Sequence, residues 1–340
     1  MPASQFKERV DLANTALDQK TKPPGSLGLL EQTAAQISAI QDTLTPATEA
    51  ALTIIFAADH GIVAEGVSAY PMEVTRQMLL NFASGGAAIN AICNANGIEL
   101  EVIDAGVAGD PVEGVLNCKV APGTENFLQA PAMTNTQLDQ ALSIGREAIS
   151  RATDRGITLI ALGEMGIGNT TSAAAMVSAL CTVGSNVTVG RGTGVDDAGL
   201  KRKIDVVKQA LEQHPDRTPE AVLQNLGGFE IAAMCGAMLK AVDHNIAIVV
   251  DGYIATAAAL CAVAIDSNVR EHLLFAHQSV EPGHTIALQH LQATPLLQLE
   301  LRLGEGSGAA LAIPLIRSAA AILCDMATFE SAGVDTQTAG

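Results

Sequence analysis

Three glycine-rich segments carry charged side chains in a pattern that could bind a phosphorylated ligand. The first covers residues 163–171 and includes Glu164, the second covers residues 190–197, and the third covers residues 302–308 and includes Glu305. Glycines let the backbone approach a ligand closely, and the amides at a helix start can hold an anion. We therefore interpret all three segments as candidate ligand-binding turns.

The first segment follows a β-branched run, but it matches neither common nucleotide-binding loop. No Lys precedes Thr170, as a Walker loop requires, and the GxGxxG spacing of dinucleotide-binding proteins is missing. The segment could equally be a tight strand-to-helix turn capped by Asn169 or Thr170. A buried Glu164 would suit hydrogen bonding to a sugar hydroxyl.

The second segment is followed by Lys201, which could supply a cation. If Asp196 or Asp197 caps the next helix, Lys201 lies just over one turn into it and can point back at the loop. Backbone amides and one ammonium would then form a phosphate site. The alternative is that residues 201–203 form a solvated basic face.

In the third segment, Glu305 is bracketed by Gly304 and Gly306. A carboxylate near a helix N-terminus is normally stabilised in its ionised form, whereas burial raises its pKa toward the range useful for a general base. Arg302 could pair with a substrate phosphate or with Glu305 itself. Glu305 could also be only a first-turn partner of the helix dipole.

The histidines give no metal-binding signature. His60, His277 and His284 lack HExxH or a comparable ligand spacing, so we predict no metal site. Asp59 and His60 could bind one metal only if Asp251 or His277 joined them in space.

Runs of mostly apolar and β-branched residues alternate with helical patterns in the middle of the chain, and the first glycine-rich segment follows one of these runs. Runs at 52–58, 99–105, 157–162 and 246–250 each end in a glycine-bearing loop followed by an Ala-rich helical pattern. Such alternation predicts a Rossmann-like, three-layer α/β fold: a parallel sheet with helices on both faces. Its ligands bind outside the carboxyl ends of the strands, where these loops fall.

The two ends of the chain show helical patterns without strands. We predict a large α/β substrate-binding domain over residues 46–300 and a small helical lobe built from residues 1–45 and 301–340, with Glu305 at the junction. The polar segment 111–131 contains Pro and Gly and is predicted to be irregular surface structure.

The composition excludes several classes of protein. Hydrophobic residues make up 48% and charged residues 16%, which excludes a disordered chain or a coiled coil. The net charge of −17 disfavours binding to nucleic acid or anionic membranes. The apolar run 254–265 is too short to span a bilayer, and the run 309–323 is interrupted by Pro314 and Arg317. The first residues do not form a signal peptide, and six widely spaced cysteines indicate a reduced, cytoplasmic protein.

The sequence resembles the nicotinate-nucleotide–dimethylbenzimidazole phosphoribosyltransferase family over nearly its whole length. The motifs that carry the resemblance occur in order: KPPGSLGLLE (22–31), FAADHGIVAEGVSAYPMEVTRQML (56–79), GGAAIN (85–90), GEMGIGNTT (163–171), GRGTGVDD (190–197), DGYIATAAAL (251–260), HQSVEPGH (277–284) and RLGEGSGAALA (302–312).

The resemblance implies transfer of phosphoribose from nicotinate mononucleotide to 5,6-dimethylbenzimidazole, a step in assembling the nucleotide loop of cobalamin. It also implies a homodimer that needs no cofactor and no metal. Two rival readings are a nucleotide-dependent kinase or dehydrogenase, which the missing loop signatures disfavour, and an inert nucleotide-binding module, which would not require Glu305.

The family resemblance also assigns roles to residues of this chain. Glu305 matches the catalytic base. The phosphate and ribose would be held by Glu164, Gly166, Asn169, Gly192, Gly194, Lys201, Ser279 and Arg302. The benzimidazole pocket would be formed by Ser68, Tyr70, Pro71, Met72, Gln77 and Leu303, an apolar slot suited to a flat aromatic ligand.

Overall fold

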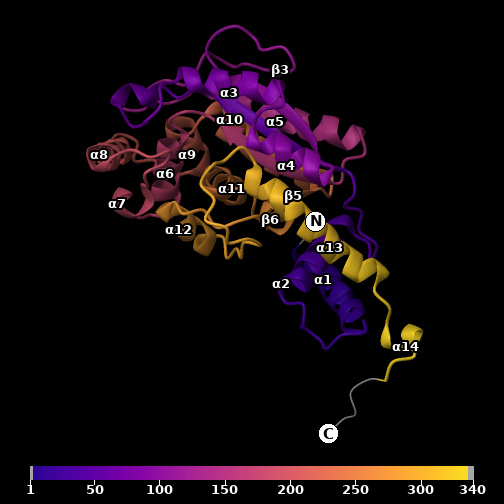
Figure 1. Ribbon diagram of the computed structural model, residues 1–340. Coiled ribbons are helices and arrows are strands. Elements are labelled where there is room, and N and C mark those ends of the chain that lie inside the picture. The colour runs from indigo at the N-terminus through magenta and orange to yellow at the C-terminus, as the bar shows by residue number, and fades with distance from the viewer. Residues whose placement is uncertain (1–2, 336–340) are drawn as a thin grey trace.

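The computed structural model describes residues 3–335, and within them six strands form one parallel sheet (Figure 1). The strands are β1 (Ala51–Ala58), β2 (Glu99–Gly106), β3 (Leu116–Asn117), β4 (Leu159–Met165), β5 (Ala247–Val250) and β6 (Leu273–Phe275). Their order across the sheet is β3-β2-β1-β4-β5-β6, and every neighbouring pair is parallel. The predicted α/β fold class is therefore confirmed.

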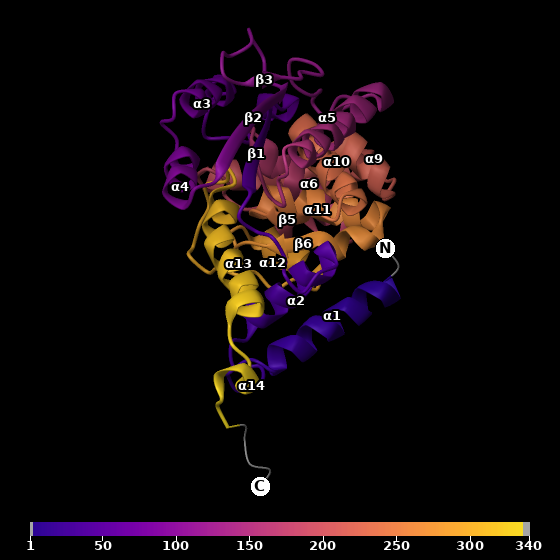
Figure 2. The ribbon, with the colours of Figure 1, turned by 90° about the vertical axis from the view of Figure 1, so that its right-hand side faces the viewer.

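Helices cover both faces of the sheet because its strands are apolar on both sides. On one face, Ile54 and Phe56 of β1 pack with α5 (Asn135–Asp154), α6 (Asn169–Leu180), α10 (Phe229–Asp243) and α11 (Tyr253–Ile265). On the other face, Ile55 and Ala57 pack with α3 (Glu73–Ala83), α4 (Ala88–Asn96) and α13 (Ser307–Asp325). Figure 2 shows these two layers on opposite sides of β1 and β2.

The remaining elements lie around this three-layer core. They are α1 (Ala3–Asp18), α2 (Leu29–Gln41), α7 (Ser185–Thr188), α8 (Asp197–Gln213), α9 (Pro219–Leu226), α12 (Pro282–His290), α14 (Phe329–Ala332) and the short 3₁₀ helices η1 (Gly61–Glu65) and η2 (Ser267–His272).

Helices α1 and α2 pack against the C-terminal half of α13, although they are far apart from it in sequence. Ala13 and Leu17 of α1, Ala34 of α2, and Ala319 and Leu323 of α13 form one small apolar cluster. The N-terminal half of α13 instead packs on the face of the sheet that α3 and α4 also cover, so α13 connects this cluster to the strands (Figure 2). The lobe predicted over 1–45 and 301–340 extends at both ends beyond the described residues.

The apolar helix α13 agrees with the helical pattern predicted near the C-terminal end of the chain. It runs through Pro314 without a break, because losing one helical hydrogen bond need not end a helix that is packed along its length. Among the helices of residues 3–335 it alone is long and apolar enough to cross a membrane, but 56% of that window is buried in the protein. Arg317 anchors its far half by donating to the carbonyl oxygens of Thr48 and Asn96.

Two short strands escape prediction from the sequence. β6 has three residues and β3 has two, which is too few for a periodic pattern to emerge. The expectation that segment 111–131 is wholly irregular is therefore wrong at β3, where Leu116 and Asn117 extend the sheet edge.

Candidate active site

The loops that carry most of the predicted site residues meet at the point in the sheet where the strand order reverses. β1 and β4 are neighbours at the centre of the sheet, and their connections leave in opposite directions, so a crevice opens at their carboxyl ends. A cleft at this edge is lined by the segments that follow β4, β5, β6 and α7 and by the turn before α13. Of the predicted site residues, it contains Glu164, Gly166, Asn169, Gly192, Ser279, Arg302 and Leu303.

Glu305 lies on a tight turn against the end of β4. Gly304, Glu305 and Gly306 all have left-handed backbone, with φ of 84°, 62° and 76°. A side chain on Gly304 would meet the Glu164 carboxylate, and one on Gly163 would lie 2.5 Å from the Gly306 nitrogen. The glycines are therefore needed for both conformation and space, and they allow the turn to approach the strand.

The Glu305 carboxyl is 5% exposed, and its Oε2 atom has no hydrogen-bond partner. Burial raises its pKa, the nearby Asp251 carboxylate raises it further, and the Ile89 amide at the start of α4 lowers it. A buried carboxylate with a free oxygen and a raised pKa is suited to accept a proton from a ligand in the cleft.

Glu164 is a second buried carboxyl in the same cleft, and it belongs to β4 itself. Burial raises its pKa to about 8, with the negative charge of Glu230 adding to the effect. Asn169, in the first turn of α6, donates a hydrogen bond to Glu164 Oε2. Glu164 is thus mostly protonated at neutral pH and can donate a hydrogen bond to a hydroxyl of a bound ligand.

The buried cation of the site is Lys203. Lys201, the predicted residue, points to solvent, whereas Lys203 is 1% exposed and donates to Thr170 Oγ1 at 2.6 Å. Two positions along a helix differ by about 200°, so the residues lie on nearly opposite sides of α8. Asp196 caps this helix by accepting from the Gly199 amide, as one of the sequence alternatives expected.

Lys203 is close to both glycine loops. Its Nζ would lie 3.1 Å from a side chain on Gly192, and a hollow lined by Lys203 also includes Gly166, Asn169 and Thr170. Burial lowers the pKa of Lys203 to about 8, and the Glu281 carboxylate opposes that effect. The ammonium is therefore charged at neutral pH and available to a ligand anion.

Glu281 and His284, which the sequence reasoning did not assign, organise the other side of the cleft. Glu281 Oε1 accepts the Gly192 amide at 3.0 Å, so it holds the second glycine loop against the start of α12. His284 Nδ1 accepts the Ser279 amide at 2.9 Å and its Nε2 lies 2.9 Å from Thr256 Oγ1. Burial lowers the pKa of His284 to about 3, so this neutral ring fixes Ser279 at the cleft.

Some predicted residues lie outside the buried part of the cleft. Gly194 is exposed, and the proposed benzimidazole residues Ser68, Tyr70, Pro71, Met72 and Gln77 lie on the open segment between η1 and the first turns of α3. Tyr70 is 49% and Leu303 is 55% exposed. Ser68 alone of the α3-side group lines the hollow that contains Lys203.

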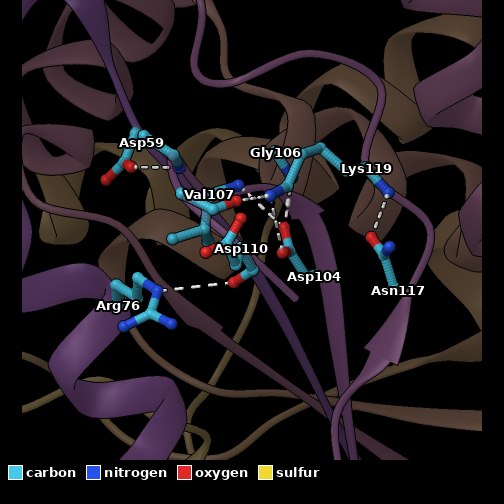
Figure 3. Close-up of polar contacts among 10 residues, drawn as sticks. Asp59, Arg76, Asp104, Gly106, Val107, Asp110, Asn117 and Lys119 are labelled. Carbon is cyan, nitrogen blue, oxygen red and sulfur yellow. Dashed lines mark hydrogen bonds and ion pairs between the residues drawn. The ribbon is translucent and has the colours of Figure 1, made fainter. Parts of the chain in front are cut away.

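Asp59 and His60 point to different partners. His60 lies 2.5 Å from buried Glu230 and 3.0 Å from Ser172. Asp59 instead accepts the Ala108 amide at 2.8 Å (Figure 3). Across residues 3–335, no three His, Cys, Asp or Glu side chains are grouped so that they could hold a metal ion.

Figure 3 shows that the polar cluster around Asp59 belongs to the loop after β2. Asp104 accepts the amides of Gly106 and Val107, and Arg76 of α3 donates to the Asp110 carbonyl oxygen. Lys119 lies 3.5 Å from the other Asp104 oxygen. These contacts stabilise the loop that lies beside α3.

The crevice at the reversal point, the buried ammonium and the glycine turns lie together at the carboxyl edge of the sheet, where open α/β sheets bind their ligands. A family model described as phosphoribosyltransferase matches residues 5–334. Two proteins named nicotinate-nucleotide–dimethylbenzimidazole phosphoribosyltransferase are similar to this chain. The one from Ralstonia nicotianae is 51% identical over 95% of this chain and 92% of its own length, and the one from Shewanella oneidensis is 49% identical over 98% and 96%.

Solved structures agree with these relatives. The crystal structure of CobT from Thermus thermophilus superposes with a TM-score of 0.94 at 48% identity, covering 97% of this chain and all of that one. The chain belongs to the nicotinate-nucleotide–dimethylbenzimidazole phosphoribosyltransferase family.

Proposed function

We propose that this protein transfers phosphoribose from nicotinate mononucleotide to 5,6-dimethylbenzimidazole in the assembly of the cobalamin nucleotide loop. The products are α-ribazole 5′-phosphate and nicotinate. The observation that carries the proposal, beside membership of the family, is the buried Glu305 carboxyl with a free oxygen, directly after Gly304, which lines the cleft.

The acceptor needs such a base. One benzimidazole nitrogen has a lone pair and the other carries a proton. The lone pair attacks C1′ of the ribose while Glu305 removes the proton from the other nitrogen, so positive charge does not build up on the ring. The bond from C1′ to the pyridine nitrogen breaks and its electron pair leaves with nicotinate. Attack opposite the leaving group turns the β-nucleotide into an α-riboside.

The rest of the cleft binds the nucleotide. We propose that Lys203, together with amides of the glycine loops, binds the phosphate, because it is the buried cation that faces both loops. Protonated Glu164 would donate to a ribose hydroxyl. Lys201 is too exposed for this role, although Gly166, Asn169, Gly192, Ser279 and Arg302 lie where a nucleotide could contact them.

The departing nicotinate needs little assistance, because the pyridinium ring becomes neutral as it leaves. We accordingly propose no metal or cofactor for this step. Holding both substrates in reacting geometry can supply several kcal/mol of the barrier reduction.

The benzimidazole slot, the assembly and the location are further parts of the proposal. Tyr70 and Leu303 are exposed apolar residues, and a homodimer that pairs over this side of the cleft would help close the slot around the base. We also propose that the clustered terminal helices act as a small lobe that carries Glu305 beside the sheet. The six cysteines are all free, which fits a cytoplasmic protein.

The test is incubation with nicotinate mononucleotide and dimethylbenzimidazole, followed by product analysis. Nicotinate and the phosphorylated riboside should form in equal amounts. Absence of both products from a folded protein that binds the mononucleotide would contradict the proposal.

A further inference from the structure

Helix α13 begins without a capping side chain of its own. Its N-cap is Gly306, and the first amides of a helix have no partner within the helix. A side chain from another strand takes this role: Asp251, directly after β5, accepts the Ala309 amide through Oδ1 at 2.9 Å. Burial raises the pKa of Asp251 above its ordinary value, and His277 and the amides of Ala309, Gly308 and Gly306, which face the carboxylate, partly oppose that effect. Asp251 thus fixes the first turn of α13 from outside.

The residue just before this turn is Glu305, whose backbone needs to be held. A non-glycine residue at a φ of 62° is in the left-handed region, which costs about 1–3 kcal/mol and persists only where the surroundings enforce it. On one side, the Glu305 amide donates to the Glu164 carbonyl oxygen at 3.3 Å. On the other side, the enforcing contact is the Asp251 carboxylate on the start of α13.

His277 completes the support from the end of β6. Its Nε2 lies 3.8 Å from Asp251 Oδ1, and its ring lies so close to Gly308 that an added side chain there would be 2.0 Å from Cδ2. Asp251 and His277 are 2% and 3% exposed. The start of α13 is therefore clamped between two buried side chains from neighbouring strands.

Asp251 also influences the charge state of Glu305. The groups that face Glu305 are Asp251 after β5, Glu164 in β4 and the Ile89 amide of α4. Asp251 raises the pKa of Glu305, and the Ile89 amide lowers it. A negative Asp251 therefore makes Glu305 a stronger base.

We propose that Asp251 is the positioning residue for Glu305: it fixes the turn that precedes α13 and lies against β4, and so holds the Glu305 carboxyl where it can accept the benzimidazole proton. This inference rests on the proposed function, in which Glu305 is the base. Asp251 itself lines the cleft, and in this inference it acts through Glu305 and not by binding a substrate.

The experiment is a double-mutant cycle on kcat with Asp251→Asn, Glu305→Gln and the combined variant. Asn keeps an oxygen that can accept the Ala309 amide but removes the charge, so the protein should fold. Asn replaces a charge-assisted hydrogen bond with a weaker neutral one, so the turn is held less firmly. Asp251→Asn should therefore lower kcat about 10- to 100-fold, the order expected for a misplaced reacting group, and leave KM for the mononucleotide within about twofold. The acid limb of its kcat profile should move to lower pH. Asp243→Asn, an exposed carboxylate paired with Lys240, is the control for loss of one negative charge.

The combined variant separates positioning from other roles. If Asp251 acts through Glu305, adding Asp251→Asn to Glu305→Gln should leave the residual kcat unchanged, because the base is already gone. Independent, multiplying effects, an unmoved acid limb, or a KM increase without loss of kcat would overturn the inference. Asp251→Ser, which also retains an acceptor oxygen, repeats the cycle if the Asn variant does not fold, and failure of both to fold would mean that Asp251 supports the whole fold instead.

The proposed function can fail separately. If Glu305→Gln alone retains normal turnover, the assignment of the base is wrong. If Glu305→Gln loses turnover but the cycle is additive, only the role of Asp251 is wrong.

Discussion

Replacing Lys203 with Met should weaken binding of the phosphate-bearing substrate selectively. Met preserves most of the buried side-chain volume but removes the ammonium that donates to Thr170 Oγ1 and faces the Gly192 loop. A charge-assisted hydrogen bond contributes about 1.5–3 kcal/mol, so affinity for nicotinate mononucleotide should fall about 10- to 150-fold. Lys201→Met is the matched control from the same helix, and it should leave affinity nearly unchanged because Lys201 is exposed.

Isothermal titration calorimetry with the mononucleotide and with nicotinate riboside, which lacks the phosphate, measures the effect. Lys203→Met should bind the riboside about as well as the unmodified protein does. The pKa of Lys203 is about 8, so mononucleotide affinity of the unmodified protein should also fall as pH rises through 8. A larger effect of Lys201→Met, or equal losses for riboside and mononucleotide, would refute the reasoning.

Lys203 should also make the free energy of unfolding of the substrate-free protein depend on pH. Its pKa is about 8 when folded, against an ordinary value of 10.5, so the unfolded chain binds more protons between these values and stability rises with pH there. The shift corresponds to up to about 3 kcal/mol. Denaturant unfolding should show this rise between pH 8 and 10.5 for the unmodified protein, relative to Lys203→Met. Parallel pH dependences of the two proteins would contradict the lowered pKa.

Two more perturbations test the carboxyl side of the cleft. Glu164 has a pKa of about 8 in the folded protein, above the ordinary 4.5, so the free energy of unfolding should fall as pH rises from 4.5 to 8. Glu164→Gln, which mimics the neutral carboxyl, should remove that fall in chemical denaturation. An unchanged fall in the variant would rule out the raised pKa. Gly306→Ala should cost about 1–2 kcal/mol for its left-handed backbone and also lower kcat, because a side chain there would lie 3.1 Å from Thr53 Cγ2. Gly333→Ala, at a φ of 62° with nothing within 4 Å, should show the stability cost by thermal unfolding without the kcat loss, and equal kcat losses would show that turn geometry is not the cause.

The strand and loop pattern could be predicted because it is local. The long strands β1 and β4 are mostly apolar runs, and the first glycine-rich segment follows β4 directly, so the sheet and the edge carrying the cleft follow from the sequence. The helical patterns near both ends of the chain likewise match α1, α2 and α13. β6 could not be found in this way, because its three residues are ordered by pairing with β5 and not by their own pattern.

The errors in the site arise where side-chain direction depends on packing. Lys201 and Lys203 are indistinguishable by type, and only the docking of α8 against α6 decides which one is buried. A helical-face argument could have favoured Lys203, since Val206, Val207 and Ala210 mark the buried side of α8. Asp251 gave no such signal, because its role depends on the start of α13, more than fifty residues later in the chain.

The most direct test of the account is proton NMR of the anomeric position during turnover, with the unmodified protein and with Glu305→Gln. We predict a single α-riboside product formed together with nicotinate, and a rate about 10² to 10⁴ lower for the folded variant because the amide cannot accept the ring proton. A β-riboside product would require a second displacement and an enzyme nucleophile. Formation of that product, or near-normal turnover by Glu305→Gln, would contradict the claim that Glu305 is the base in a single inverting transfer.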